Sequence, residues 1–306
     1  MKHAKWPAAT ATAITLALAP VTEPITPARR STLAWASIGF IGAVAFFISA
    51  CSALSPAALP APSPALVNEM APTGRLRAAI NFGNPLLATR SPSGGEPTGV
   101  SVDLARELGL RLGVPVELVT FTAAELAVQA AKNALVDIAF VAVDPVRGAD
   151  IGQTAPYLVI EGAYLVKESS PIRVNADVDR AGTRIVVGQA SAYDLYLSRE
   201  IKAATLVRAP TSPLVTDLMV KDNYEVAAGV KQQLQLDAKR YPGLRLLEGR
   251  FMTIDQAMGL PKGREAGLAY LKAFVEDVKA SGFVGQAIAA NKVDGATVAP
   301  NAEMPR

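Results

Sequence analysis

Histidine is almost absent from this chain of 306 residues, and the one histidine, His3, lies close to the start. The body of the chain therefore has no imidazole. This excludes Ser-His-Asp and Cys-His catalysis there, and it excludes zinc or iron held by histidine. Carboxylates, lysine, tyrosine and serine remain as possible catalytic groups. We expect no metal and no cofactor.

A basic excess is also missing from the body of the chain. The whole sequence holds 30 Lys and Arg against 27 Asp and Glu, a formal net charge of +3. Residues 1–50 contain four of the basic residues and one acidic residue, so the remainder holds 26 of each. A nucleic-acid surface needs a basic excess on the folded domain. We therefore expect no nucleic-acid partner.

Cysteine occurs once, as Cys51, directly after an apolar run. Residues 33–50 carry no charge, and Arg29 and Arg30 precede them. A positively charged segment followed by an apolar one is the order found in secretory signals. The segment from Ile48 to Cys51 resembles the lipobox of bacterial lipoproteins, in which small residues precede a cysteine that is lipidated and becomes the mature N-terminus. The resemblance implies lipidation of Cys51.

This interpretation divides the first part of the chain in two. Residues 1–50 form a signal leader, and residues 51–73, rich in proline, alanine and serine, form a tether. The alternative is a retained transmembrane helix, because the uncharged run 33–50 is just long enough to span a bilayer. Both alternatives place the body of the protein in the periplasm or another extracytoplasmic space, held at the membrane.

Between residues 74 and 293, short β-branched runs alternate with amphipathic segments, which predicts an α/β protein. Leu104, Leu108 and Leu112, followed by Gly113, indicate one helix and its end. A body of this length is large for one small core and suits two lobes. We expect strands at residues 75–81, 114–121, 136–143, 184–188, 204–207, 226–230 and 244–247. We expect helices at residues 102–112, 122–134, 191–201, 213–220 and 264–280.

Five segments of this body, taken in order, resemble successive blocks of the family 3 extracellular solute-binding proteins. They read GRLRAAINFGNP, GVSVDLARELGLRLGVPVELV, VDIAFVAVDPVRGADIGQTAPYL, TRIVVGQASAYD and AMGLPKGREAGLAYLKAFVEDVKASGF. Members of this family deliver polar amino acids and related solutes to ABC importers. The resemblance extends from Gly74 to about Ala290. It implies a two-lobed, periplasmic-binding-protein-like α/β fold of type II, in which each lobe is a mixed sheet flanked by helices.

The resemblance also implies how the chain divides between the lobes. Lobe 1 is expected to comprise residues 74–158 and 256–293, and lobe 2 residues 162–253. Two hinge segments near residues 157–161 and 253–256 would join the lobes and let them close over a ligand. A flexible tail, residues 294–306, is expected to follow.

Arg147, at the end of the motif DPVR, is the first candidate binding residue. The resemblance implies that an arginine here binds the ligand carboxylate, and a planar guanidinium offers two parallel donors for that task. A solvated loop arginine is the alternative. Ser191 matches a hydroxyl residue that opens a lobe 2 helix, where free N–H groups can bind an anion. It also fits a plain helix cap, and both roles can coexist.

At other positions this sequence departs from the family pattern. Asn84 stands where an aromatic side chain often stacks on the ligand, with Asn81 and Phe82 beside it. Ala142 stands where a Thr or Ser usually helps to bind the carboxylate. We nevertheless include these four positions in the expected ligand site.

The acid that binds the ligand ammonium in the family would fall near Val230, and Lys231 stands beside that place. A buried ammonium without a counter-charge is costly, which disfavours an ordinary α-amino acid in the usual pose. Arg147 and Lys231 together would favour a ligand with more than one acidic or polar oxygen group, although Lys231 also fits an exposed lysine at a helix start. Thr211 and Ser212 could add hydroxyl contacts or serve only as caps.

These observations favour a monomeric, non-catalytic receptor that closes on a small carboxylate-bearing solute and delivers it to an ABC permease in the inner membrane. One alternative is a periplasmic cyclohexadienyl or arogenate dehydratase on the same scaffold. Glu161 would then be the general acid, provided that desolvation keeps it protonated, and it would otherwise be a hinge-surface glutamate. Another alternative is a ligand sensor, which we expect to act through a separate partner.

Overall fold

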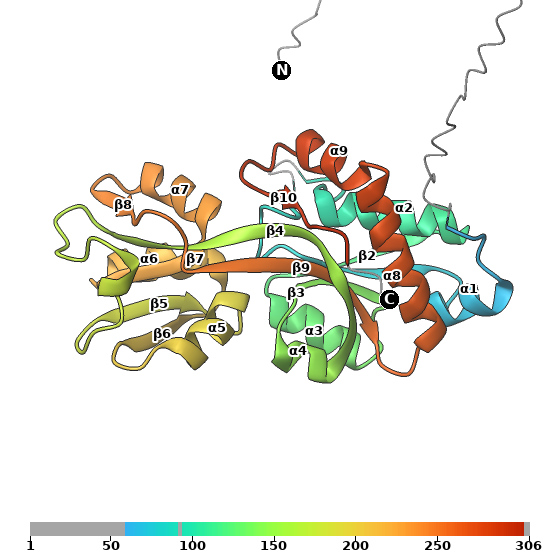
Figure 1. The fold of residues 1–306 in the computed structure, drawn as a ribbon, viewed down its shortest axis with the longest axis horizontal. Helices are drawn as coiled ribbons and strands as arrows, with labels where there is room; N and C mark the ends of the chain where they lie inside the picture. The colour runs from blue at the N-terminus through green and yellow to red at the C-terminus, as the bar shows by residue number, and fades with distance from the viewer. Residues whose placement is uncertain (1–58, 91–93, 303–306) are drawn as a thin grey trace, which may run out of the picture. The chain divides into compact units, whose positions relative to one another are not determined.

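The computed structural model describes residues 59–90 and 94–302 (Figure 1). The expected leader, its transmembrane alternative and the expected lipidation site, Cys51, lie outside the described residues. Within the described ranges, no helix combines the length and the apolar character needed to cross a membrane.

The described elements alternate between strands and helices along most of the chain. The strands are β1 (Leu76–Asn81), β2 (Val116–Phe121), β3 (Ile138–Ala142), β4 (Ile151–Lys167), β5 (Arg184–Gly188), β6 (Thr205–Ala209), β7 (Val226–Val230), β8 (Leu244–Leu246), β9 (Met252–Pro261) and β10 (Thr297–Val298). The α-helices are α1 (Pro64–Met70), α2 (Val100–Leu112), α3 (Ala124–Lys132), α4 (Pro145–Asp150), α5 (Ala192–Glu200), α6 (Val215–Lys221), α7 (Lys231–Arg240), α8 (Glu265–Ala280) and α9 (Phe283–Ala290). Short 3₁₀ turns, η1 (Asn175–Asp177) and η2 (Ser212–Leu214), complete them.

The strands form a sheet in the order β2-β1-β3-β9-β4-β7-β5-β6. At its centre, the long strands β4 and β9 run antiparallel and pair from Ile151 with Pro261 to Gly162 with Met252. Parallel strands β1, β2 and β3 lie beyond β9, and parallel strands β5, β6 and β7 lie beyond β4. We call the first group, with α1–α4, α8 and α9, lobe 1, and the second group, with α5–α7 and β8, lobe 2. Figure 1 shows β4 and β9 side by side as the connection between the lobes.

Strand β3 is buried along its whole length because apolar clusters cover both of its faces. Ala139 and Val141 pack with residues of α3 in one cluster. Ile138, Phe140 and Ala142 belong to a second cluster that includes α2 and α8. Side chains of a strand alternate between its faces, so a strand covered on both sides is apolar without interruption. This explains the continuous run from which the strand was predicted.

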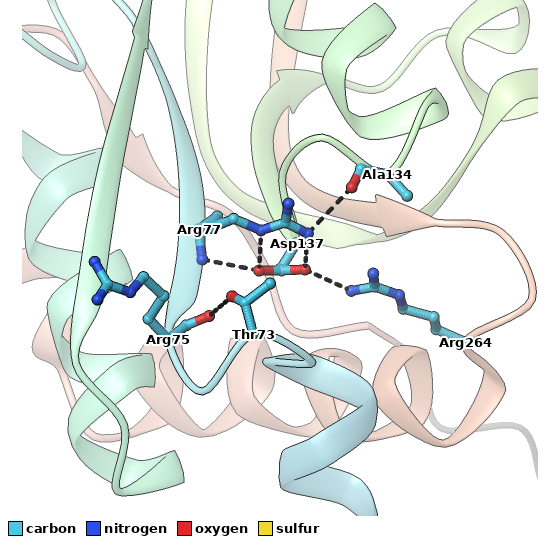
Figure 2. A network of polar contacts seen from close by, with 6 residues as sticks. All are labelled: Thr73, Arg75, Arg77, Ala134, Asp137 and Arg264. Carbon is cyan, nitrogen blue, oxygen red and sulfur yellow. Dashed lines mark hydrogen bonds and ion pairs between the residues drawn. The ribbon is translucent and has the colours of Figure 1, made fainter.

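A buried carboxylate fixes the start of β3 to β1 and α8. Asp137 is fully buried. Its Oδ2 accepts hydrogen bonds from the backbone N and Nε of Arg77 at 2.9 and 3.0 Å. Its Oδ1 accepts from Nη2 of Arg77 at 2.8 Å and from Nη1 of Arg264 at 3.0 Å (Figure 2). Each oxygen thus has two donors, which offsets the cost of burying the charge.

Lobe 2 repeats this arrangement with different residues. The backbone N and Nε of Arg184 both donate to Oε2 of Glu225 at 2.9 Å, and its Nη2 donates to Oε1 at 2.6 Å. The same guanidinium reaches the carbonyl of Asn223 at 3.0 Å, as Arg77 reaches the carbonyl of Ala134 at 3.1 Å. Both carbonyl residues have a left-handed backbone, with φ of 55° and 53°. The lobes therefore share a local motif that no sequence repeat reveals.

Most strands and helices predicted from the sequence are confirmed within a few residues, and β5 and β7 match the predicted ranges 184–188 and 226–230. The mixed α/β fold, with two parallel-stranded groups joined by two connecting strands, is confirmed as well. The residue bounds expected for the lobes and hinges stay predictions.

The tether predicted up to residue 73 is wrong for its last part, because residues 64–70 form helix α1. Ser63 caps this helix, and Pro64 occupies its first turn, where proline is well tolerated. Met70 is buried, and Oε1 of Glu69 accepts a hydrogen bond from the backbone N of Gly267 on α8 at 2.8 Å. The Pro/Ala composition concealed a helix that packs on lobe 1.

The flexible tail predicted for residues 294–306 is likewise wrong for the part that the structure describes. Thr297 and Val298 form β10, which pairs antiparallel with Val159 and Leu158 of β4. Ala299 is buried, and its backbone N donates to the carbonyl of Tyr157 at 3.1 Å. A two-residue strand is too short to leave a period in the sequence, which explains the error.

Candidate functional site

A cavity lies where the parallel strands of both lobes end. Asn81 at the end of β1, Ala142 at the end of β3 and Val230 at the end of β7 line it, together with Gln189 directly after β5. In open α/β sheets, ligands bind outside the carboxyl ends of the strands. The cavity volume is about 50 Å³, room for roughly four water molecules. The geometry therefore defines a candidate site for a small molecule held between the lobes.

Arg147 of α4 provides the one charge among the described residues that line this cavity. Its side chain is buried, with 2% of the residue exposed. Nη2 donates to the backbone carbonyl of Ala190 at 2.9 Å, and Nη1 donates to that of Ala142 at 3.4 Å. Its Nε is buried and has no hydrogen-bond partner among the described residues. Burial lowers the pKa of Arg147, while Asp144 and Glu125 act to raise it, and a guanidinium in a protein stays charged.

Asp144 caps the start of helix α4 and links it to α5. Oδ1 of Asp144 caps it by accepting from the backbone N of Val146 at 2.9 Å. Oδ2 of Asp144 accepts from Nη2 of Arg199 on α5 at 2.9 Å. Only 4% of the Asp144 side chain is exposed. This ion pair joins lobe 1 to lobe 2 directly beside Arg147.

Ser191, expected in the site, lines the cavity and caps α5, so the cap role is confirmed. Its Oγ accepts from the backbone N of Asp194 at 3.1 Å. Tyr193 and Ser212 lie next to it in the cavity wall. Burial raises the pKa of the Tyr193 phenol, while Ser212 and Ser191 act to lower it. A Cβ on Gly188 would lie 2.6 Å from the Ser212 Oγ and 2.8 Å from the Tyr193 hydroxyl, so these hydroxyls approach a bare backbone.

Asn81, Asn84 and Ala142, all expected in the site, line the cavity, whereas Phe82 does not. Oδ1 of Asn81 accepts from the backbone N of Gly83 at 2.8 Å and shapes the turn after β1. Phe82 is partly buried and lies under the guanidinium of Arg90, 5.1 Å from its ring centroid. Ala142 takes part through its carbonyl, which accepts from Arg147.

Thr211 and Lys231 were also expected to contact the ligand, and both lie outside the cavity lining. Thr211 precedes η2, and the next residue, Ser212, reaches the cavity instead. Nζ of Lys231 donates to Oε2 of Glu161 at 2.8 Å, and Nη1 of Arg250 donates to Oε1 at 2.8 Å. The charge of Lys231 is therefore neutralised away from the cavity, and it does not support a second acidic group on the ligand.

Glu161 does not meet the requirement for a general acid. The hydrogen bond from Lys231 first, and then that from Arg250, lower its pKa below the usual range. The expectation was that desolvation would keep this carboxyl protonated, and the two cations reverse that effect. Glu161 also does not line the cavity.

The sequence interpretation missed Gln256 on β9, Gln189 after β5 and Tyr193 on α5 as lining residues. Tyr193 and Gln189 lie in the block TRIVVGQASAYD, two positions from Ser191, so their proximity to that cap was the available signal. Gln256 comes from a segment distant in sequence and reaches the cavity through the pairing of β9 with β3. Among the described residues, no group of His, Cys, Asp and Glu is arranged to hold a metal ion.

Two α/β lobes, two connecting strands and a cavity between the lobes define the class of two-lobed, periplasmic-binding-protein-like structures. A family model described as bacterial extracellular solute-binding proteins, family 3, matches residues 76–290, and the chain belongs to this family.

Solved structures share this fold at low sequence identity. A solute receptor for L-cysteine from Neisseria gonorrhoeae has a TM-score of 0.65 and 19% identity, over 75% of this chain and 94% of that one. A binding component of an ABC transporter from Wolinella succinogenes, complexed with lysine, has 0.63 and 19%, over 71% and 95%. The ancestral amino acid-binding protein AncCDT-1, a precursor of cyclohexadienyl dehydratase, has 0.63 and 18%, over 73% and 98%. No curated protein sequence matches the chain.

Proposed function

We propose that this protein is an extracytoplasmic receptor of an ABC importer that closes by hinge motion on a small carboxylate-bearing solute. It acts as a monomer, held at the membrane by a lipid on Cys51 after its leader is removed, and passes the solute to a permease in the inner membrane. The two connecting strands β4 and β9 are the hinges of this motion.

The proposal depends on the burial of Arg147 and on the hydrogen-bond partners of its guanidinium. A buried guanidinium costs free energy unless an anion compensates it. Here the partners of Nη1 and Nη2 are backbone carbonyls, and Nε has none among the described residues. A carboxylate offers two oxygens that match the fork of a guanidinium. We therefore assign the carboxylate of the solute to Arg147.

Contacts between the lobes support closure over the solute. Arg147 and Asp144 of lobe 1 each bond to lobe 2, at Ala190 and Arg199. The cavity is lined from both lobes, with Asn81 and Asn84 on one side and Ser191 and Ser212 on the other. A solute bound there contacts both lobes, so it favours the closed arrangement through its differential affinity.

The dehydratase alternative loses its candidate acid, since Lys231 and Arg250 neutralise Glu161 outside the cavity. The sensor alternative shares the binding step with the receptor and differs only in the partner. A receptor that delivers its solute is therefore the function that we propose.

A thermal-shift screen tests this function. Purified protein is heated with small monocarboxylates, hydroxy acids, dicarboxylates and amino acids, each in excess. A ligand at a hundred times its Kd stabilises the folded state by about 2.7 kcal/mol, which raises Tm by about 5–10 °C for a domain of this size. The shift should disappear in Arg147→Met. A shift that persists undiminished in this variant, or no shift with any acid, would overturn the proposal.

A further inference from the structure

We infer that the solute carries one carboxylate and no cationic amine, so that the site selects deaminated or hydroxy acids over the corresponding amino acids. This inference rests on the proposed function, and it narrows the class of solute.

Among the described residues, the cavity lining carries a positive charge and no negative charge. Among the described lining residues, Arg147 is charged and all others are apolar or neutral. The neutral polar side chains include Asn81, Asn84, Ser191 and Gln256. Amides and hydroxyls bind neutral polar groups well, but they do not supply the negative charge that a buried ammonium requires.

Two buried carboxylates close to the lining residues, Asp144 and Asp194, are already paired with cations. Asp144 accepts from Arg199 and from the backbone N of Val146 at the start of α4. Asp194 is buried, and it forms an ion pair with Arg208 at 3.0 Å and accepts from the backbone N of Ala190 at 2.8 Å. To pair with Asp144 or Asp194, an ammonium in the cavity would have to displace Arg199 or Arg208.

Glu161 is no more accessible to an ammonium, because Lys231 and Arg250 occupy both of its oxygens. The ammonium would also lie near the guanidinium of Arg147. Two like charges repel strongly where little water screens them. The electrostatic balance therefore favours a solute that brings one negative charge and no positive charge.

A substitution at position 230 can reverse the preference for an acid over the corresponding amino acid. Val230 ends β7, lines the cavity and is the N-cap residue of α7. Asp and Asn are both favoured at an N-cap, so either residue should be tolerated there. Val230→Asp adds a negative charge to the cavity wall, and Val230→Asn is its neutral control with the same shape.

Isothermal titration with pairs of compounds tests the inference. Each pair consists of an acid without an amine and the corresponding amino acid. The pairs are L-lactate with L-alanine, glycerate with L-serine, and succinamate with L-asparagine, each titrated into wild type, Val230→Asp and Val230→Asn. We expect wild type and Val230→Asn to prefer the first member of a pair by at least about tenfold, and Val230→Asp to reduce that preference by at least about tenfold.

Failure of this inference and failure of the proposed function give different results in this experiment. Amino acids that bind wild type as tightly as their partners, or a preference that Val230→Asp leaves unchanged, would overturn this inference and leave the proposed receptor intact. If no acid of either kind bound to any of the three proteins, the proposed function itself would be overturned together with the inference.

Discussion

Nη2 of Arg147 in lobe 1 donates a hydrogen bond to the backbone carbonyl of Ala190 in lobe 2, at 2.9 Å. Ala190 has a left-handed backbone, with φ of 51°, and its N–H is held by Oδ2 of Asp194 at 2.8 Å. A carbonyl is a weaker partner for a guanidinium than a carboxylate is. The residue that we assign to the solute therefore also connects the lobes, and it does so through a bond that a solute carboxylate can replace.

Arg147→Met should abolish solute binding and at the same time stabilise the folded protein. Removing a buried cation that lacks a carboxylate partner should raise the free energy of unfolding by about 1–3 kcal/mol, because the desolvation cost disappears. Solute binding should be lost in the same variant. Urea unfolding without ligand and titration with ligand measure the two effects. Arg106→Met, at an exposed arginine of α2, is the control, and a loss of stability in Arg147→Met beyond that of the control would contradict our account.

Arg199→Gln should loosen the contact between the lobes. Arg199 is the cationic partner of the buried Asp144, and 42% of its own side chain is exposed. A pair of this kind contributes about 0.2–1 kcal/mol, so the closed form should lose population and affinity for the solute should fall about threefold. Small-angle scattering should also find a larger radius of gyration without ligand. Lys221→Gln, an exposed change in the same lobe, should alter neither quantity, and equal scattering from both variants would refute the expected role.

Local sequence patterns predicted the parts of the fold that depend on local physics. The apolar run around Phe140 predicted a strand covered on both sides, and Ser191 predicted the start of α5. Helix α1 and strand β10 were missed because their formation depends on surfaces of α8 and β4 that are distant in sequence.

In the candidate site, too, the sequence predicted some of the lining residues and missed others. The position of Arg147 in the cavity wall agrees with the motif DPVR. The role predicted for Lys231 failed, because its partner Glu161 lies 70 positions away and sequence proximity to Val230 could not reveal that ion pair. Gln256 was missed for a similar reason, since the pairing of β9 brings it to the cavity.

Asp137→Asn should be one of the most destabilising single changes in lobe 1. The carboxylate is fully buried and compensates both Arg77 and Arg264, so an amide would leave two cations without their counter-charge. Breaking a buried ion pair costs about 3–5 kcal/mol, which urea unfolding can measure. Glu117→Gln is the matched control, because Glu117 pairs with Arg75 at the surface and should contribute less than about 1 kcal/mol. Similar losses in both variants would show that burial is not what makes Asp137 important.

Glu161 should make stability depend on pH in the acid range. Lys231 and Arg250 lower its pKa in the folded protein below that in the unfolded chain, so the ionised carboxylate stabilises the folded state. This contribution is fully present above the unfolded pKa of about 4.3, and it is lost as the pH falls through the folded pKa. The difference in Tm between wild type and Glu161→Gln should therefore be positive at neutral pH and should shrink in the acid range.

Thermal unfolding of both proteins in a series of buffers from neutral to strongly acidic pH gives this difference directly. Glu248→Gln, at an exposed glutamate in the segment before β9, corrects for the general effect of removing one negative charge. A difference that stayed constant across the series would mean that Glu161 stabilises the connecting strands through packing. The ion pairs with Lys231 and Arg250 would then have no part in holding β4 against α7 and the start of β9.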